Sequence, residues 1–152
     1  NKVIVTQWVL QPQGFPLEQP PPAQLPSHQF TLLHVYGSLF FAAAKSMEEL
    51  LPKVGSTTHA VVAINLRGKS EIGSTFMTVL QRYSEALQER KSKLMLVGVD
   101  PVVRDQLAKT GLLKVLGEEN VFVATPQLGA ALNQAVAAAT EWLDQRAAGP
   151  ER

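Results

Sequence analysis

Two adjacent hydroxyl residues, Ser74 and Thr75, follow Gly73 where an apolar run at 59–66 gives way, through a short loop, to an amphipathic segment. Backbone N–H groups and the positive end of a helix dipole converge at such a point. Ser74 and Thr75 are therefore placed to contact an anion or to carry a phosphate on either hydroxyl. The basic residues Arg67 and Lys69, in the loop just before, would favour an anion. The alternative is plain capping of the helix by Ser74.

Other patterns that signal catalysis or metal binding are missing from the sequence. The chain has no cysteine, which excludes disulfides, thiol catalysis and cysteine-ligated zinc. Its histidines lack the spacing that places two imidazoles on one metal ion; they are His28, His34 and His59. The segment 68–70 resembles the end of a phosphate-binding loop, but Ala63 stands where that loop requires glycine. We expect no catalytic residue, no metal, no cofactor and no enzymatic activity.

Length and composition fit one compact domain. The chain has 152 residues, of which 45% are hydrophobic and 18% are charged. Fourteen basic residues against thirteen acidic ones leave a net charge of +1, which predicts no nucleic-acid partner. The longest apolar run, 39–44, is far short of the roughly 20 residues that cross a bilayer, so we expect a soluble piece. Because it begins at Asn1 without a signal-peptide pattern, we interpret it as a fragment of a longer protein.

Apolar runs alternate with amphipathic segments along the chain. Strands are predicted at 2–9, 30–37, 59–66, 93–98 and 121–124. Helices are predicted at 46–53, 74–91, 100–111 and 126–147, with a brief further turn at 112–116. This order predicts an α/β domain in which about four α-helices flank a mixed central β-sheet. The first two strands have no helix between them and should pair antiparallel at one edge.

Short signals predict where these helices begin and end. Residues 46–49 form a capping box, and Ser74 is a candidate N-cap. Asp100-Pro101 and Thr125-Pro126 each combine a capping residue with proline at the first helical position. Gly111 suits the position just after a helix, where a left-handed conformation is common.

Between residues 10 and 29 the chain is rich in proline, with six of the ten prolines in this segment. Proline lacks an N–H donor and has a fixed φ, so it is excluded from helix and sheet interiors. We interpret the segment as an extended surface loop. A ligand for an SH3-type module is the alternative, although no basic residue flanks it.

The stretch AVVAINLRGKSEIGSTFMTVLQRYSEALQERKSKLMLVGVDPVVRDQLAKTGLLKVLGEENVFV resembles the STAS domain. That domain occurs in soluble bacterial anti-sigma-factor antagonists and at the cytoplasmic C-terminus of SulP anion transporters. Three motifs carry the resemblance, at 72–76, 110–117 and 120–123, and it covers roughly 30–147. It implies a single STAS-like domain: a first strand at 1–9 following a membrane-domain linker, a Pro-rich loop at 10–29, a STAS core at 30–147 and a tail at 148–152.

Within this resemblance, Thr75 falls on the serine that is phosphorylated in the soluble antagonists. Two positions depart from the family pattern, because Gly73 replaces the usual aspartate and Phe76 replaces the usual glycine. Loss of the carboxylate removes a group that would orient the phosphoryl transfer. A large aromatic ring at Phe76 crowds the start of the helix, so both departures argue against phosphorylation at Thr75.

The N-terminal half resembles the SulP transporters more than the soluble antagonists. The strand at 2–9, the Pro-rich loop and Val35-Tyr-Gly-Ser-Leu-Phe-Phe-Ala42 look like the corresponding series in those transporters. The resemblance implies a non-enzymatic regulatory and dimerisation domain that belongs to an integral membrane transporter of anions. The domain would lie at the cytoplasmic face of the plasma membrane, and we interpret the transported anion as bicarbonate. Its partners would be a second copy, the transporter's membrane domain and a cytosolic regulator. Trp8, Phe40 and Phe41 are the candidate contact residues.

Two other functions stay open from the sequence. One is a soluble partner-switching protein, similar to the anti-sigma-factor antagonists, in which phosphorylation of Ser74 or Thr75 breaks a complex. The other is an anion- or nucleotide-binding module that uses the start of the helix at Ser74. The second can coexist with a transporter domain.

Overall fold

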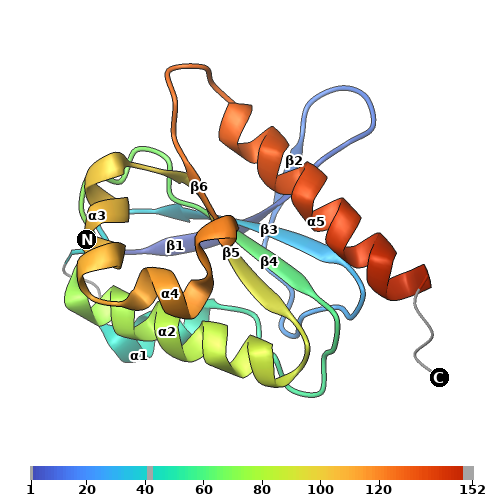
Figure 1. The fold of residues 1–152 in the computed structure, drawn as a ribbon, viewed down its shortest axis with the longest axis horizontal. Coiled ribbons are helices and arrows are strands. Elements are labelled where there is room, and N and C mark those ends of the chain that lie inside the picture. Colours follow the sequence, from blue (N-terminus) through green and yellow to red (C-terminus); the bar gives the residue numbers. More distant parts are fainter. Residues whose placement is uncertain (1, 41–42, 149–152) are drawn as a thin grey trace.

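A six-stranded mixed sheet forms the centre of the molecule (Figure 1). The computed structural model describes residues 2–40 and 43–148. Along the sheet the strands follow the order β2-β1-β3-β4-β5-β6. They are β1 (Ile4–Val9), β2 (Leu17–Gln19), β3 (Phe30–Tyr36), β4 (Val61–Asn65), β5 (Lys93–Val99) and β6 (Val121–Val123). The strands β3 to β6 are parallel, whereas β1 is antiparallel to both of its neighbours, which confirms the predicted mixed sheet.

Helices cover both faces of this sheet (Figure 1). They are α1 (Ala44–Leu50), α2 (Ser74–Glu89), α3 (Pro101–Lys109), α4 (Leu112–Leu116) and α5 (Ala130–Ala148), and a short 3₁₀ turn lies at Glu118–Asn120. Helices α1 to α4 pack on one face with the larger of two apolar clusters. Helix α5 packs alone on the other face, where a smaller cluster lies beneath it.

The two central strands explain this arrangement. Every residue of β4 is buried, and so are six of the seven residues of β5. Successive side chains point to opposite faces, so Val62 and Ile64 join the larger cluster while Val61 and Ala63 join the smaller one. A strand that is apolar on both faces requires cover on both, which is the pattern of buried parallel sheets.

Two of the helix signals are confirmed. The Asp100 carboxylate accepts a hydrogen bond from the backbone N–H of Val102 at 2.8 Å, directly before Pro101, the first residue of α3. Gly111 has a φ of +83° and separates α3 from α4. The turn expected at 112–116 is a helix of five residues.

Three other helix signals are wrong. Helix α1 begins at Ala44, two residues before the predicted capping box at Ser46, and no side chain caps it. Helix α2 is capped by the backbone of Gly73 and begins at Ser74, so Ser74 is not its N-cap. Helix α5 begins at Ala130, and the Thr125-Pro126 pair lies in the loop before it. For α2, the hydrogen bond from Gly73 to the loop after β3 holds the helix start.

The proline-rich segment contains more structure than the expected extended loop. Residues Leu17–Gln19 form β2, an edge strand that pairs with β1. Farther along, the Leu25 side chain is buried, its N–H donates to Lys53 O at 3.0 Å, and its carbonyl accepts from the Thr57 hydroxyl. The prolines lie outside β2, as their missing N–H groups require.

Small side chains allow α5 to lie close to the sheet. Ala131, Ala135 and Ala139 are buried at intervals of four residues and face β4 and β5. The helix predicted at 126–147 also included Leu128, but this residue precedes α5 and is 77% exposed. Helix α5 can therefore lie close to the sheet because the side chains of these three alanines are small.

We expect Ala135→Leu to lower the free energy of unfolding by about 1–3 kcal/mol, because the added methylene groups have no space between α5 and the sheet. Chemical denaturation followed by circular dichroism measures the change. The matched control is Ala137→Leu, at an exposed position of the same helix, which should change stability by less than about 0.5 kcal/mol. Equal effects of the two substitutions would contradict this packing.

Candidate functional site

The start of α2 lies where the loop after β4 meets the loop after β3. Gly73, the N-cap, has extended backbone dihedrals, and its N–H donates to Leu39 O at 3.2 Å. On the opposite flank the Gln106 side chain of α3 exchanges hydrogen bonds with both backbone groups of Ile72, at 3.4 Å. The helix start is therefore clamped between the β3 loop and α3.

Close contact with the β3 loop explains why glycine occupies position 73. A Cβ atom added to Gly73 would lie 2.5 Å from the carbonyl oxygen of Phe40 and 3.3 Å from that of Leu39. Both are backbone atoms, so the crowding cannot be relieved by turning a side chain. The departure from the aspartate of the STAS motif thus has a steric cause. Phe76, the second departure, is fully buried in the larger core cluster.

Ser74 and Thr75 differ in their exposure to solvent. Ser74 is exposed and Thr75 is half-buried. Within the described part of the chain neither hydroxyl takes part in a hydrogen bond. Ser74 lines a shallow depression of about 190 Å³ with Thr78 and Thr110. The site thus presents two unengaged hydroxyls at the start of a 16-residue helix.

The two basic residues expected beside this helix start have other partners. The Lys69 ammonium donates to Gly37 O at 2.7 Å, and the Arg67 guanidinium donates to Thr125 O at 3.2 Å. Thr125 precedes α5, on the other face of the sheet. The anion site expected at Ser74 therefore has backbone N–H groups, but Arg67 is directed away from it.

A second polar cluster lies on the strands β1, β2 and β3. The Glu18 carboxylate of β2 accepts hydrogen bonds from the Thr6 hydroxyl at 2.7 Å, from the Trp8 indole N–H at 2.9 Å and from the Tyr36 hydroxyl. The Trp8 ring stacks on His34 with centroids 4.2 Å apart. Thr6 and Trp8 alternate along β1, so both point to the same face of the sheet as Glu18.

Hydrogen bonding shifts the acidity of this cluster. The three donors favour the charged form of Glu18 and lower its pKa from 4.5 to about 2, with the Tyr36 hydroxyl as the largest cause. The same bond raises the pKa of Tyr36, because ionised tyrosine could not donate to the carboxylate. Burial lowers the pKa of His34, and Lys69 adds to this effect while Glu18 opposes it. Sequence reasoning missed Glu18 because β2, which positions it, was not predicted.

The predicted contact residues Trp8 and Phe40 do not form one patch. Trp8 of β1 pairs with Leu32 near the start of β3, whereas Phe40 lies beyond the end of that strand. Trp8 is half-buried and Phe40 is 46% exposed. Phe41 lies outside the described residues. The surface around Phe40 is therefore separate from the Trp8 cluster.

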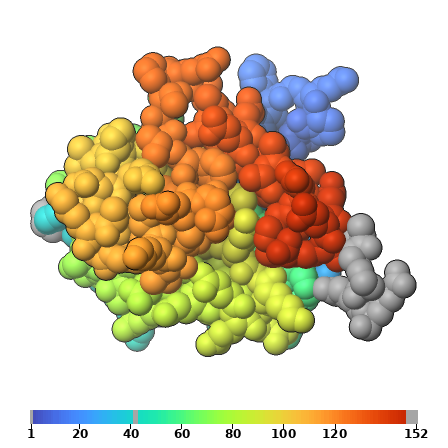
Figure 2. Space-filling model, viewed as in Figure 1, coloured from blue at the N-terminus to red at the C-terminus, as the bar shows by residue number. Residues whose placement is uncertain are grey.

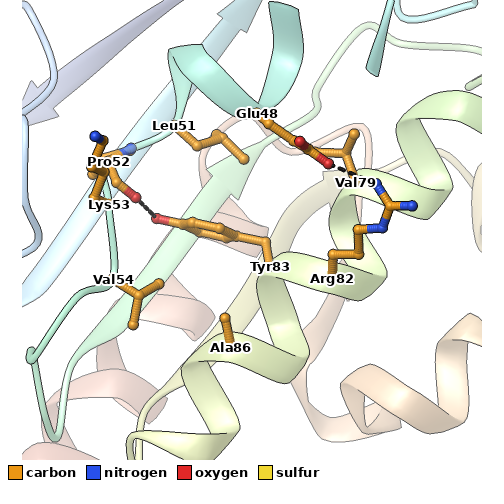
Figure 3. A pocket seen from close by; sticks show the side chains of 9 residues that line it. All are labelled: Glu48, Leu51, Pro52, Lys53, Val54, Val79, Arg82, Tyr83 and Ala86. Atoms are coloured by element: carbon orange, nitrogen blue, oxygen red, sulfur yellow. Dashed lines mark hydrogen bonds and ion pairs between the residues drawn. The ribbon is translucent and has the colours of Figure 1, made fainter. Parts of the chain in front are cut away.

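A third feature is a cavity of about 270 Å³ between α1 and α2 (Figure 3). Leu51, Val54 and Val79 contribute apolar walls. The Tyr83 hydroxyl donates to Pro52 O at 2.7 Å, and burial raises the pKa of this tyrosine. Arg82 and Glu48 form an ion pair of 3.0 Å at the rim. The Tyr83, Arg82 and Glu48 side chains in Figure 3 are thus already paired, which leaves Lys53 as the remaining charged side chain among the described residues that line the cavity.

Residues 2–40 and 43–148 contain no cluster of three or more histidine or acidic side chains that could hold a metal ion. Across these same residues, none of the helices combines the length and apolarity that a membrane span needs.

Comparison with known proteins identifies the family. The sequence pattern of the STAS domain matches residues 21–127. No curated protein sequence matches the chain. The resemblance was expected over residues 30–147. The match begins nine residues earlier, at residue 21, and ends before helix α5.

Three solved structures are similar to this chain. A sulfate transporter family protein from Wolinella succinogenes is 25% identical, with a TM-score of 0.62, over 79% of this chain and 91% of that one. The STAS domain of a SulP transporter from Vibrio cholerae is 24% identical, with a TM-score of 0.54, over 78% of this chain and 86% of that one. SLC26A9 shares the fold, with 14% identity and a TM-score of 0.64; the match covers 98% of this chain and 26% of SLC26A9.

We expect Gly73→Asp, which restores the aspartate of the STAS motif, to lower the free energy of unfolding by about 1–3 kcal/mol. The new Cβ meets the Phe40 carbonyl, and the loop must move. Thermal unfolding measures the loss, and Ser74→Ala, at the exposed neighbouring position, is the control with little expected effect. A neutral or stabilising Gly73→Asp would show that the β3 loop does not press on this position.

Stability should depend on pH through Glu18. Because its folded pKa lies below the unfolded value of 4.5, its contribution is present above pH 4.5 and is lost as the pH falls towards about 2. Glu18→Gln should therefore lower the melting temperature at pH 7, and the difference from the wild type should shrink across this window. Glu85→Gln, at an exposed position of α2, is the control. A difference that stayed constant from pH 7 to pH 2 would contradict the assignment.

Proposed function

This chain belongs to the STAS domain family, and we propose that it is the cytoplasmic regulatory and dimerisation domain of a SulP-family anion transporter. The observation that carries the proposal is its similarity to the Wolinella succinogenes protein, which is described as a sulfate transporter family protein and is matched over 91% of its length. In this proposal the membrane domain precedes residue 1, and bicarbonate is the transported ion. The domain acts through contacts rather than catalysis.

Exposed apolar side chains support a role in contacts. Phe40 is 46% exposed, and Ile4 is 52% exposed on β1. Near the edge of the sheet, Phe15 and Leu17 are 91% and 58% exposed. Burying such side chains against a membrane domain or a second copy would remove apolar area from water. Phe40 also contacts Gly73 through its backbone, so a partner on Phe40 would press on the start of α2.

Partner switching by phosphorylation is the second candidate. It is favoured by the exposure of Ser74 and by the absence of any hydrogen bond to its hydroxyl within the described residues. A phosphate at this first residue of α2 would lie at the positive end of the helix dipole. The carboxylate that orients this reaction in the soluble antagonists is missing at Gly73. We therefore place this function second.

The test uses the full-length protein that carries this domain, in membrane vesicles. We expect the coding sequence upstream of residue 1 to encode a series of roughly 20-residue apolar segments. Deleting residues 1–152 should reduce bicarbonate uptake several-fold and weaken chemical cross-linking of the dimer. Phe40→Ser should produce part of this loss, while Val102→Ser, at an apolar position of α3 that is 62% exposed, should not.

Two outcomes would overturn the proposal. One is an upstream sequence with an initiating methionine and no apolar segments, which would favour the partner-switching protein. The other is a full-length transporter whose uptake and cross-linking do not change when the domain is deleted. Uptake of another anion with the same dependence on the domain would retain the regulatory role and remove bicarbonate.

A further inference from the structure

A cavity of about 280 Å³ lies on the α5 face of the sheet, apart from Ser74 and from the cavity between α1 and α2. It sits where the carboxyl ends of β4 and β5 meet the start of α5. In open parallel sheets this is the edge at which ligands bind. The loop before α5 and the hairpin of β1 and β2, which both contribute to the cavity, project from the same side of the molecule (Figure 2).

Asn65 and Arg67 supply hydrogen-bond donors to this cavity, which is also lined by the His34 imidazole, whose Nδ1 is buried without a hydrogen-bond partner among the described residues. Asn65, the last residue of β4, is only 8% exposed. Its Oδ1 accepts from the backbone N–H of Arg67 at 3.0 Å, which leaves its Nδ2 amino group facing the cavity with no acceptor among the described residues. Arg67 also lines the cavity, and only its Nη1 is engaged, by Thr125 O at 3.2 Å. Among the described residues, Asn65 Nδ2 is not one of the buried side-chain atoms that lack a partner, so this donor keeps access to solvent and to a ligand in the cavity.

The start of α5 adds two more donors. The N–H of Ala130 binds Gln127 O at 3.2 Å and that of Asn133 binds Gly129 O at 2.9 Å. Between them, the N–H groups of Ala131 and Leu132 find no acceptor within the described part of the chain. Both residues line the cavity. The dipole of this 19-residue helix places its positive end at the same point.

The remaining walls are apolar. The Trp8 ring, stacked on His34, forms one side, and Val97, Leu128 and Leu132 form others. Among the described residues that line the cavity, none is acidic. The Glu18 carboxylate contacts Trp8 through the indole N–H and is already engaged by three donors. One end of the cavity is therefore suited to negative charge and the other to an apolar body.

We infer that this cavity binds a small organic anion, whose carboxylate or phosphate lies on the donors of Asn65, Arg67 and the start of α5 and whose apolar body packs against Trp8. The inference goes beyond the proposed function and does not depend on it. The negative charge of the ligand follows from the four donors, which are the Asn65 amide, the Arg67 guanidinium and the N–H groups of Ala131 and Leu132. Acceptor oxygens can satisfy all of them, and a cation can satisfy none. The volume leaves room for more than an inorganic ion but less than a large cofactor.

The test uses the 152-residue chain and benzoate as the probe, at constant ionic strength. Two-dimensional NMR follows the backbone amides of Ala131 and Leu132, the Asn65 side-chain amide and the Trp8 indole N–H. We expect saturable shifts of these four signals with benzoate. Benzyl alcohol, which has the same ring without the charge, should bind at least about tenfold more weakly, since charged hydrogen bonds are lost.

Substitutions locate the headgroup. Asn65→Asp keeps the oxygen that accepts from Arg67 and replaces the free donor with a second negative charge, so benzoate affinity should fall at least about tenfold. Arg67→Gln should also weaken binding, and it provides an answer if Asn65→Asp does not fold. The matched control is Arg82→Gln, which removes a cation on α2 across the sheet and should leave affinity unchanged.

Three results would overturn the inference. Absence of saturable shifts at up to tens of millimolar benzoate would remove the site. Equal binding of benzyl alcohol would show an apolar cavity without anion recognition. An equal loss of affinity in Arg82→Gln and Arg67→Gln would show a general effect of net charge rather than a site at α5.

Discussion

The burial of β4 and β5 on both faces is the constraint on which the rest of the structure depends. These strands expose almost no side chain to water, so both faces of the sheet must be covered. The crossovers between β3, β4, β5 and β6 place α1 to α4 on one face. The other face is left to α5, which lies close because alanines line its inner stripe. The position of α5 in turn fixes where its free N–H groups point.

Backbone segments crowd together at the carboxyl edge of the sheet, and two glycines make this possible. At Gly73 the β3 loop crosses the start of α2, and at Gly98 an irregularity within β5 lies beside Asn65 and Arg67. Gly98 has a φ of +68°, and an added Cβ would lie 3.0 Å from the Cβ of Arg67 and 3.1 Å from Asn65 Oδ1. Glycine at these positions allows the backbone segments to approach, and at position 98 it leaves room for the side-chain oxygen of Asn65.

The sequence predicted the strands and helices that depend on continuous local patterns. It failed for those whose position is set by contacts between distant segments of the chain. Apolar runs located β3 to β6, and Asp100-Pro101 located α3, because these signals are local. The strand β2 has no apolar pattern; it pairs with β1, and its Glu18 bonds to Thr6, Trp8 and Tyr36 on two other strands. Ser74 looks like a cap, but the start of α2 is set by contacts of Gly73 with Leu39 and Phe40. Thr75 could be identified as the phosphorylated position of the family only through the resemblance, because hydroxyl side chains are common at helix starts.

The segment that matches the STAS family and the segments outside it contribute different parts of the carboxyl edge. Asn65, Arg67 and Ser74 lie within the match at 21–127, on the strands and loops that define the family fold. The strands β1 and β2 and the helix α5 lie outside it. Yet Trp8 of β1 and Leu132 of α5 wall the cavity beside Asn65. The matched segment thus supplies Asn65, Arg67 and Val97 to that cavity, while β1 and α5, outside the match, supply Trp8, Leu132 and the free N–H groups at the start of α5. Because the eight-residue loop 66–73 contains both Arg67 and Gly73, it joins the two faces of this edge, and it is hydrogen-bonded at Lys69, Ile72 and Gly73.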